Sequence, residues 1–215
     1  MRMTPYKPAW VEIFIIFVMV LTLRAWAQPV QAAVPGSARV ETGQANQFIA
    51  DLGAQAILVL RQTGQPVEHR EAIIRDMLSQ RFALEFIGRF ALGRYWRAAS
   101  AGQQKEYLSL FSEFVVETYS SMLSGYVDES FEVQGATQAG QYDTIVSSRI
   151  TSGARDPVRV DWRLRMVDGQ PQIIDVSVGG VSMSITKREE FAALVQRNGV
   201  QGLLDVMRAR SRGLP

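Results

Sequence analysis

Residues 158–178 constrain the fold of this chain more than any other stretch. Apolar and charged side chains alternate without a break over residues 158–166, the period of two shown by a strand with one buried and one wet face. The pair Asp168-Gly169 then supplies a strong two-residue hairpin turn, and the alternation resumes behind it. We therefore expect an antiparallel hairpin that is covered on one side only.

The return strand of this hairpin divides its side chains between two faces. We expect Ile174, Val176 and Val178 on the apolar face, with Ile173 and Asp175 on the opposite one. Two glycines follow and break the strand. The chain is therefore expected to leave the sheet at a sharp corner.

Helical periodicity precedes this sheet pattern. A capping box, in which Ser100 and Gln103 would satisfy each other's backbone N–H groups, marks one helix start. Apolar residues recur at a period near 3.6 in the stretches where we expect helices, which are residues 46–62, residues from 66 onward, residues 82–97 and residues 100–125.

The rest of the chain completes an α+β pattern. Further strands are expected over residues 130–135 and 141–151. After the sheet, a second capping box from Thr186 to Glu189 opens a helix that Gly199 ends, and a last short helix follows. The predicted class is α+β, with helices, a meander of about four strands and two short helices.

The first 27 residues are organised like a secretory signal peptide. A positively charged start, an apolar run over residues 13–23 and an A-x-A cleavage motif at residues 25–27 follow in that order. The apolar run is shorter than the roughly 18–20 residues that a membrane span needs. We therefore expect export to the periplasm and cleavage after Ala27 or at a later site up to Ala33.

The exported chain is expected to be near neutral. Removing the three basic residues and the one acidic residue of the first 27 from the 23 basic and 21 acidic residues of the chain leaves 20 of each. No basic run is present, so the sequence gives no electrostatic sign of nucleic-acid binding. We expect a loose leader over residues 28–43, a single domain over residues 44–210, and a monomer.

Most catalytic and metal-binding motifs are missing from the sequence. There is no cysteine and one histidine, His69, which excludes thiol chemistry and zinc sites built on several His or Cys ligands. We expect His69 to be solvated on a polar helix face. Asp161 and Asp175 could form a carboxylate pair on adjacent strands, but pairing with nearby arginines is the favoured interpretation. We therefore expect neither an enzyme nor a metal or cofactor site.

The sequence is instead rich in large apolar side chains. Aromatic residues gather on the predicted helices, and Trp162, Leu164 and Val176 lie on the apolar face of the predicted sheet. These residues could fill one core, or they could line a long cavity between helices and sheet. Periodicity alone does not separate a filled core from a lined cavity.

Three segments resemble one family of bacterial proteins. Residues 91–96 read A-L-G-R-Y-W and are similar to an A-L-G-x-x-W element that ends a helix in that family. Residues 104–123 resemble the family's Q-x-x-x-F…F…Y helix. Residues 174–182, followed by Arg188 and Phe191, look like its I-x-D-V-x-I-x-G-V-S segment and R-x-x-F continuation. The chain thus resembles the MlaC family of periplasmic phospholipid-binding proteins, also called toluene-tolerance proteins, over residues 46–208.

This resemblance implies a fold, a cargo and partners. It implies a widened NTF2-like or cystatin-like fold, with helices on a curved antiparallel sheet and phospholipid acyl chains between the two layers. It also implies a carrier that moves phospholipid between an inner-membrane ABC transporter, through its MCE-domain protein, and an outer-membrane lipoprotein complex. Such a carrier maintains the lipid asymmetry of the outer membrane.

The lining of the cavity is a hypothesis drawn from the helical faces and the strand alternation. The residues that we expect to contact lipid are Phe86, Phe90, Phe111, Val115 and Tyr119 from the helices, and Val160, Trp162, Leu164, Val176, Val178 and Val181 from the sheet.

Two alternative functions stay open. An NTF2-like scaffold can host a small-molecule isomerase, which would need an ionisable residue on the apolar face of the sheet, and residues 158–166 place none there. A periplasmic interaction module with a filled core and no ligand is the other alternative. The sequence does not give the lipid headgroup, the number of acyl chains, the direction of transport or the partner-binding surface.

Overall fold

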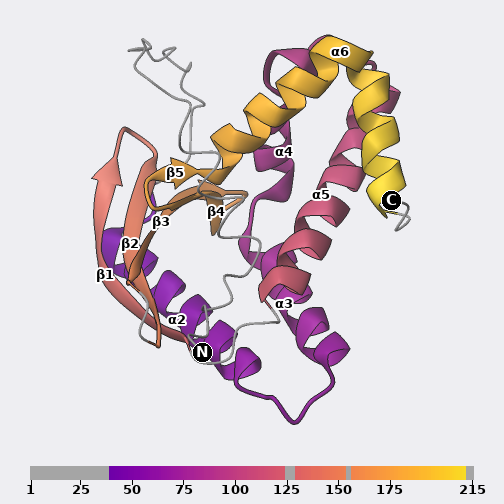
Figure 1. The fold of residues 1–215 in the computed structure, drawn as a ribbon. Helices are drawn as coiled ribbons and strands as arrows, with labels where there is room; N and C mark the ends of the chain where they lie inside the picture. Colours follow the sequence, from indigo (N-terminus) through magenta and orange to yellow (C-terminus); the bar gives the residue numbers. More distant parts are fainter. Residues whose placement is uncertain (1–38, 124–128, 154–155, 212–215) are drawn as a thin grey trace, which may run out of the picture. The chain divides into compact units, whose positions relative to one another are not determined.

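The computed structural model describes residues 39–123, 129–153 and 156–211. The predicted signal peptide and most of the predicted leader lie outside these ranges. Helices come first, a sheet follows, and a long kinked helix closes the chain (Figure 1), which confirms the α+β class. In chain order the elements are α2 (Thr42–Leu60), α3 (Val67–Arg81), α4 (Leu84–Leu92), η1 (Gly93–Trp96), α5 (Ala101–Leu123), β1 (Glu129–Ala139), β2 (Asp143–Ser152), β3 (Val158–Val167), β4 (Gln170–Val178), β5 (Val181–Ser182) and α6 (Met183–Ser211).

The five strands form one antiparallel sheet in the order β1-β2-β3-β4-β5. Trp162 in β3 pairs with Val146 in β2 and with Val176 in β4, so three apolar residues stand side by side on one face. The β3–β4 hairpin turns at Asp168 and Gly169, which have φ of 49° and 76°. Two successive positive φ values are what a type I′ turn requires, so the predicted hairpin is confirmed.

A β-bulge changes the faces of the return strand. Arg163 pairs with Asp175, but the next residue, Leu164, pairs with Ile173, so Ile174 has no partner opposite it. One extra residue in a strand reverses the faces on its far side. Ile173 therefore joins the apolar face, and the prediction that Ile174 would do so is wrong.

Helix α2 covers the apolar face of the sheet (Figure 1). Ile49 and Leu52 of α2 pack with Val146, Leu164 and Ile173. Leu52 is 8% exposed, and the other four side chains are fully buried. We call this the sheet cluster. Met77 of α3 and Phe82 also pack against it, so α2 supplies most but not all of the cover.

A second cluster joins α4, α5 and α6, and we call it the helix cluster. The rings of Tyr107, Phe111 and Phe191 meet there, with centroid separations of 5.8, 6.1 and 6.2 Å. The hydroxyl of Tyr107 donates a hydrogen bond of 2.9 Å to the carbonyl oxygen of Gly88, which ties α5 to α4. A larger residue at Gly88 would force the Phe111 ring to shift, because its Cβ would lie 2.9 Å from that ring.

A third, smaller cluster lies between α2, α3 and α5 and includes Val59, Leu78 and Val116. Phe82 packs against both this cluster and the sheet cluster. The helical periodicity predicted that Phe82 would begin a helix. It instead forms an isolated bridge with Ile173, and α4 starts two residues later.

The helix boundaries differ from prediction at both ends of the helical pattern. The expected helix over residues 82–97 is α4 followed by the 3₁₀ turn η1, because Gly93 adopts φ of 58°. The two expected C-terminal helices are the arms of α6, which bends at Gly199 with φ of 67° and ψ of 175°. The Ser100–Gln103 capping box is confirmed by reciprocal bonds of 3.1 and 3.3 Å. None of the described helices is both long and apolar enough to cross a membrane.

Candidate functional site

The corner between the sheet and α6 is held by a carboxylate and a hydroxyl. Asp175 accepts hydrogen bonds from the hydroxyl of Ser182 at 2.6 Å and from the backbone N–H of Ser184 at 3.0 Å. The Ser182 hydroxyl in turn accepts one from the N–H of Ile185 at 3.1 Å. These contacts satisfy the free N–H groups at the start of α6. The predicted capping box from Thr186 to Glu189 is therefore wrong, since α6 begins at Met183 and is capped from the strand before it.

Asp175 thus has a different role from the one that the sequence suggested. It lies opposite Arg163 in the sheet but makes no ion pair with it among the described residues. Asp161 lies opposite Ser177 rather than Asp175, so the two carboxylates are not paired. Asp161 instead pairs with Arg159 at 3.0 Å, as the favoured interpretation predicted.

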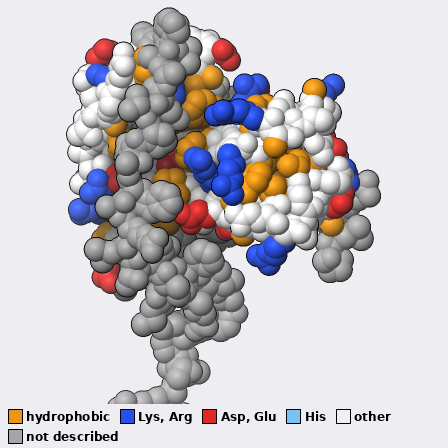
Figure 2. Space-filling model, turned by 90° about the horizontal axis from the view of Figure 1, so that it is seen from above, with side chains coloured by type: hydrophobic (Ala, Val, Ile, Leu, Met, Phe, Trp, Pro, Cys, Tyr) orange, Lys and Arg blue, Asp and Glu red, His pale blue; other side chains and the backbone are white. Residues whose placement is uncertain are grey.

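Two arginines lie over the aromatic rings of α4. The guanidinium carbon of Arg165 is 5.0 Å from the ring centroid of Phe86, and that of Arg188 is 5.1 Å from the ring centroid of Phe90. The Arg188 side chain passes close to Gly93 at the end of α4. A Cβ at Gly93 would lie 2.9 Å from the Nε atom of Arg188, so glycine leaves room for this side chain. On the face of the molecule shown in Figure 2, Lys and Arg side chains lie beside hydrophobic ones.

The structure distributes the predicted helical lining residues over several places. Phe111 and Val115 belong to the helix cluster or pack against it, and Tyr119 packs against the third cluster. Phe86 lies beneath Arg165, whose neighbours in the sheet register are Asp143 and Gln172. Since Arg165 alternates with Leu164, Phe86 lies toward the polar face of the sheet rather than the apolar one.

The predicted sheet residues stay closer together. Leu164 belongs to the sheet cluster, and Trp162 and Val176 pack against it. The indole N–H of Trp162 donates a hydrogen bond of 2.8 Å to the Ser148 hydroxyl, which satisfies its polar atom within a mainly apolar setting. Val160 is buried next to them and pairs with Val178.

One end of the sheet exposes large apolar side chains, and we call it the apolar edge. Val178 pairs with Val181 of β5, and Val181 is 41% exposed. Val158 at the start of β3 and Ile185 in the first turn of α6 are 43% and 50% exposed. Of these residues the sequence singled out Val178 and Val181. Exposed apolar side chains, with Val178 and Val181 adjacent among them, offer surface that an apolar ligand can contact.

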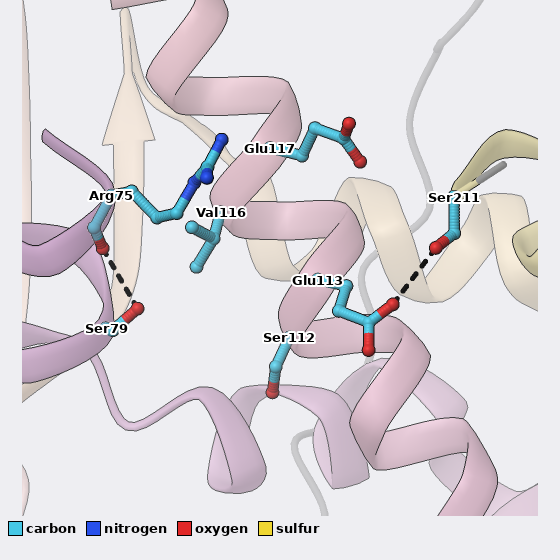
Figure 3. A pocket seen from close by; sticks show the side chains of 7 residues that line it. All are labelled: Arg75, Ser79, Ser112, Glu113, Val116, Glu117 and Ser211. Carbon is cyan, nitrogen blue, oxygen red and sulfur yellow. Dashed lines mark hydrogen bonds between the residues drawn. The ribbon is translucent and has the colours of Figure 1, made fainter. Parts of the chain in front are cut away.

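A hollow of about 400 Å³ lies elsewhere, between α3, α5 and the end of α6 (Figure 3). The Ser211 hydroxyl donates a hydrogen bond of 3.0 Å to Glu113 across it. Most of the lining surface is apolar, although Val116 is the one large apolar residue that contributes to it. Its lining residues are Arg75, Ser79, Ser112, Glu113, Val116, Glu117 and Ser211.

No group of three or more His, Asp or Glu residues lies close enough to hold a metal ion in the part of the chain that the structure describes. His69 is exposed, as predicted.

The family model whose description is MlaC protein matches residues 52–209, well over half of the chain. The chain belongs to the MlaC family. A Haemophilus influenzae protein named intermembrane phospholipid transport system binding protein MlaC is 22% identical over 147 residues, which cover 66% of this chain and 69% of that protein. The resemblance seen in the sequence is thereby confirmed.

A solved structure shares the fold of this MlaC family member. It is a phospholipid-binding protein from Ralstonia solanacearum, determined in complex with a phospholipid. It matches with a TM-score of 0.67 and 19% sequence identity, over 79% of this chain and 97% of the Ralstonia chain. The MlaC match runs from within α2 nearly to the end of α6, so it includes the Asp175 corner, the two covered rings and the apolar edge.

Several residues of interest gave little signal in the sequence. Phe82 packs against two clusters, but its spacing fitted a helical pattern. The alternation over residues 158–166 indicated that Arg165 was one of several solvated charges on a strand. The positions of Arg165 and Arg188 over α4 depend on contacts between elements far apart in the chain. A local pattern cannot reveal such contacts.

Proposed function

We propose that this MlaC family member is a phospholipid carrier of the periplasm. Family membership over residues 52–209 is the observation that carries the proposal. The name of the Haemophilus protein and the phospholipid bound to the Ralstonia protein support the choice of cargo. The signal peptide predicted from the first 27 residues supports export.

The physical need for such a carrier is large. Each CH₂ group moved into water costs about 0.8 kcal/mol, so two acyl chains cost on the order of 20 kcal/mol to expose. A free phospholipid therefore crosses an aqueous compartment very slowly. A protein that offers apolar contacts offsets this cost by binding alone.

The residues expected to line the lipid site divide into two groups by burial. Phe111, Val160 and Leu164 are nearly fully buried in packed surroundings, so they serve as walls that hold the site's shape. The partly exposed residues have free surface for contact with an acyl chain. They are Phe86, Phe90, Val115, Tyr119, Trp162, Val176, Val178 and Val181.

The proposed transport route has two membrane partners. The carrier exchanges phospholipid with an inner-membrane ABC transporter, through its MCE-domain protein, and with an outer-membrane lipoprotein complex. It acts as a monomer, and its activity maintains the lipid asymmetry of the outer membrane. The apolar edge is where we place the entry of the acyl chains, because Val181 and Ile185 already expose apolar surface there.

Transfer of labelled phospholipid from donor to acceptor vesicles tests this proposal. Val181→Asp should slow uptake severalfold, because it places a charge where acyl chains enter. Leu58→Asp is the matched control, since Leu58 is also an exposed large apolar residue, at 65%, but lies on α2. Both residues are too exposed for the change to unfold the protein.

The outcomes separate the carrier from the open alternatives. Transfer by the natural protein, slowed by Val181→Asp alone, supports a carrier with its entry at the apolar edge. Equal slowing by both variants contradicts the position of the entry. Failure of the natural protein to take up phospholipid contradicts the carrier and favours an interaction module without a ligand.

A further inference from the structure

Three arginines lie beside two of the aromatic rings of the proposed lipid site, and the lipid-carrier proposal gives these arginines no role. We call this surface the arginine face and define it as Arg163 and Arg165 of β3, Arg188 of α6, and Phe86 and Phe90 of α4. It lies toward the polar face of the sheet, because Arg163 and Arg165 alternate there with the buried Leu164.

The geometry of α4 places two guanidinium groups over neighbouring aromatic rings. Phe86 and Phe90 are four residues apart, so their side chains leave the same face of the helix with Cβ atoms about 5–6 Å apart. Arg165 lies over the first ring and Arg188 over the second, at 5.0 and 5.1 Å from the centroids. Two elements that are distant in sequence thus deliver cations to neighbouring turns of one helix.

The arginine face carries excess positive charge. Asp143 is its acidic partner and pairs with Arg165 at 2.6 Å and with Arg163 at 3.6 Å, so one carboxylate serves two guanidinium groups. Arg188 makes no ion pair with any residue in the described ranges, although it is exposed. Asp175 also lies opposite Arg163, although its oxygens accept hydrogen bonds from Ser182 and Ser184. Three cations therefore face two anions, and the surface keeps a net positive charge.

The guanidinium groups remain able to bind an anion. A guanidinium can stack on an aromatic ring through its flat face. Its N–H groups lie in the plane of the guanidinium and so stay free to donate hydrogen bonds at its edge. These N–H groups form a fork that matches the oxygens of a phosphate in a two-pronged hydrogen bond. Arg188 is exposed and 21% of the Arg165 side chain stays accessible, so an incoming phosphate can reach both guanidinium groups.

We propose that the arginine face binds a phosphate group, with Arg188 and Arg165 as its main ligands. The phosphate can be that of a phospholipid headgroup, in which case the inference rests on the proposed carrier function, or it can be free phosphate. The arginines hold it by charge and paired hydrogen bonds, and Phe86 and Phe90 fix their orientation.

Titration with inorganic phosphate tests the site itself, using protein purified from a bacterial periplasm and ³¹P NMR or calorimetry. Arg188→Gln should weaken phosphate binding roughly tenfold or more, since it removes a charged hydrogen-bond partner. Arg188→Lys keeps the charge but loses the fork, so it should weaken binding less. Arg197→Gln is the matched control, because nine residues along α6 place Arg197 on the opposite side of the helix.

A second arm identifies the source of the phosphate. Native mass spectrometry compares uptake of a short-chain phosphatidylglycerol with uptake of the diacylglycerol that has the same chains. If the headgroup occupies the arginine face, the natural protein prefers the phospholipid, inorganic phosphate reduces this preference, and Arg188→Gln abolishes it. If phosphate binds but the lipid preference does not depend on Arg188, the site takes free phosphate.

The inference fails separately from the carrier proposal. Absence of phosphate binding by the natural protein, together with a lipid preference that Arg188→Gln leaves unchanged, overturns the arginine face and leaves the carrier intact. Equal weakening by Arg188→Gln and Arg197→Gln also overturns it, because the effect would then be one of net charge. Failure to take up either lipid overturns the carrier, and the phosphate titration still decides the site.

Discussion

Asp175 accepts a hydrogen bond of 2.6 Å from the hydroxyl of Ser182, and this contact links the end of the sheet to the start of α6. Replacing Asp175 with Ala should lower the free energy of unfolding by about 1–2 kcal/mol, the usual effect of losing a helix cap. Asp175→Asn keeps one acceptor oxygen and should lose less. Urea unfolding measures both, and equal stability of the Ala variant and the natural protein would contradict this role for Asp175.

A pair of glycines in α2 should respond in opposite directions to the same change. A Cβ at Gly53 would lie 2.2 Å from a ring carbon of Phe131, whereas a Cβ at Gly43 would meet nothing within 4 Å. Gly53→Ala should therefore destabilise the protein by about 1–3 kcal/mol through overpacking. Gly43→Ala should stabilise it by up to about 1 kcal/mol, because alanine favours the helix.

Thermal or urea unfolding of the two glycine variants checks this close approach of α2 to β1. The double variant Gly53→Ala with Phe131→Leu adds a direct test. Removing the ring should relieve most of the clash, so the two changes should not add. Additive losses would show that the Gly53 effect does not come from Phe131.

Stability should fall at alkaline pH because of buried tyrosine. Burial raises the pKa of Tyr107 far above its ordinary value, and burial with the nearby Glu190 carboxylate also raises the pKa of Tyr119. Above about pH 10 the unfolded chain loses protons that the folded protein keeps. The free energy of unfolding is therefore unaffected by these groups below that pH and falls above it, by up to about 1.4 kcal/mol per pH unit for each tyrosine.

Tyr107→Phe isolates the contribution of one ring. It should cost about 1 kcal/mol near neutral pH, because the hydrogen bond to the Gly88 carbonyl is lost. It should also make the alkaline decline less steep than in the natural protein. Unfolding curves at a series of pH values measure both effects, and parallel declines would show that Tyr107 is not the group responsible.

Trp162 should report on lipid binding. It packs against the sheet cluster and is partly exposed, and Trp96 is the one other tryptophan in the described residues. In a Trp96→Phe variant, phospholipid uptake should shift the emission of Trp162 to shorter wavelength, because an acyl chain replaces water beside the indole. An unchanged spectrum during confirmed uptake would place the acyl chains away from Trp162.

Periodic elements of this fold could be predicted from the sequence, and features that depend on register could not. The alternation of β3, the Asp168-Gly169 turn and the Ser100–Gln103 cap follow from local chemistry, and the structure has all of them. The exchange of Ile173 for Ile174 on the apolar face depends on a bulge, which is a property of two strands together. The predicted capping box from Thr186 to Glu189 was wrong because the acceptor that caps α6, Asp175, lies in the preceding strand.

The candidate site was less predictable than the fold. The sheet residues Trp162, Leu164 and Val176 gather as expected, since alternation assigns a face reliably. Phe86 shared a helical face with other aromatics in the sequence, but the polar face of the sheet supplies its neighbour, Arg165. Helical periodicity tells which residues share a face, not what that face contacts.

The central claim is that this MlaC family member carries phospholipid, and native mass spectrometry of the protein purified from a bacterial periplasm tests it most directly. The carrier account predicts a mass excess equal to one bound phospholipid, whose identity organic extraction and lipid analysis then establish. A bare protein mass, with no phospholipid acquired from vesicles, would contradict the account.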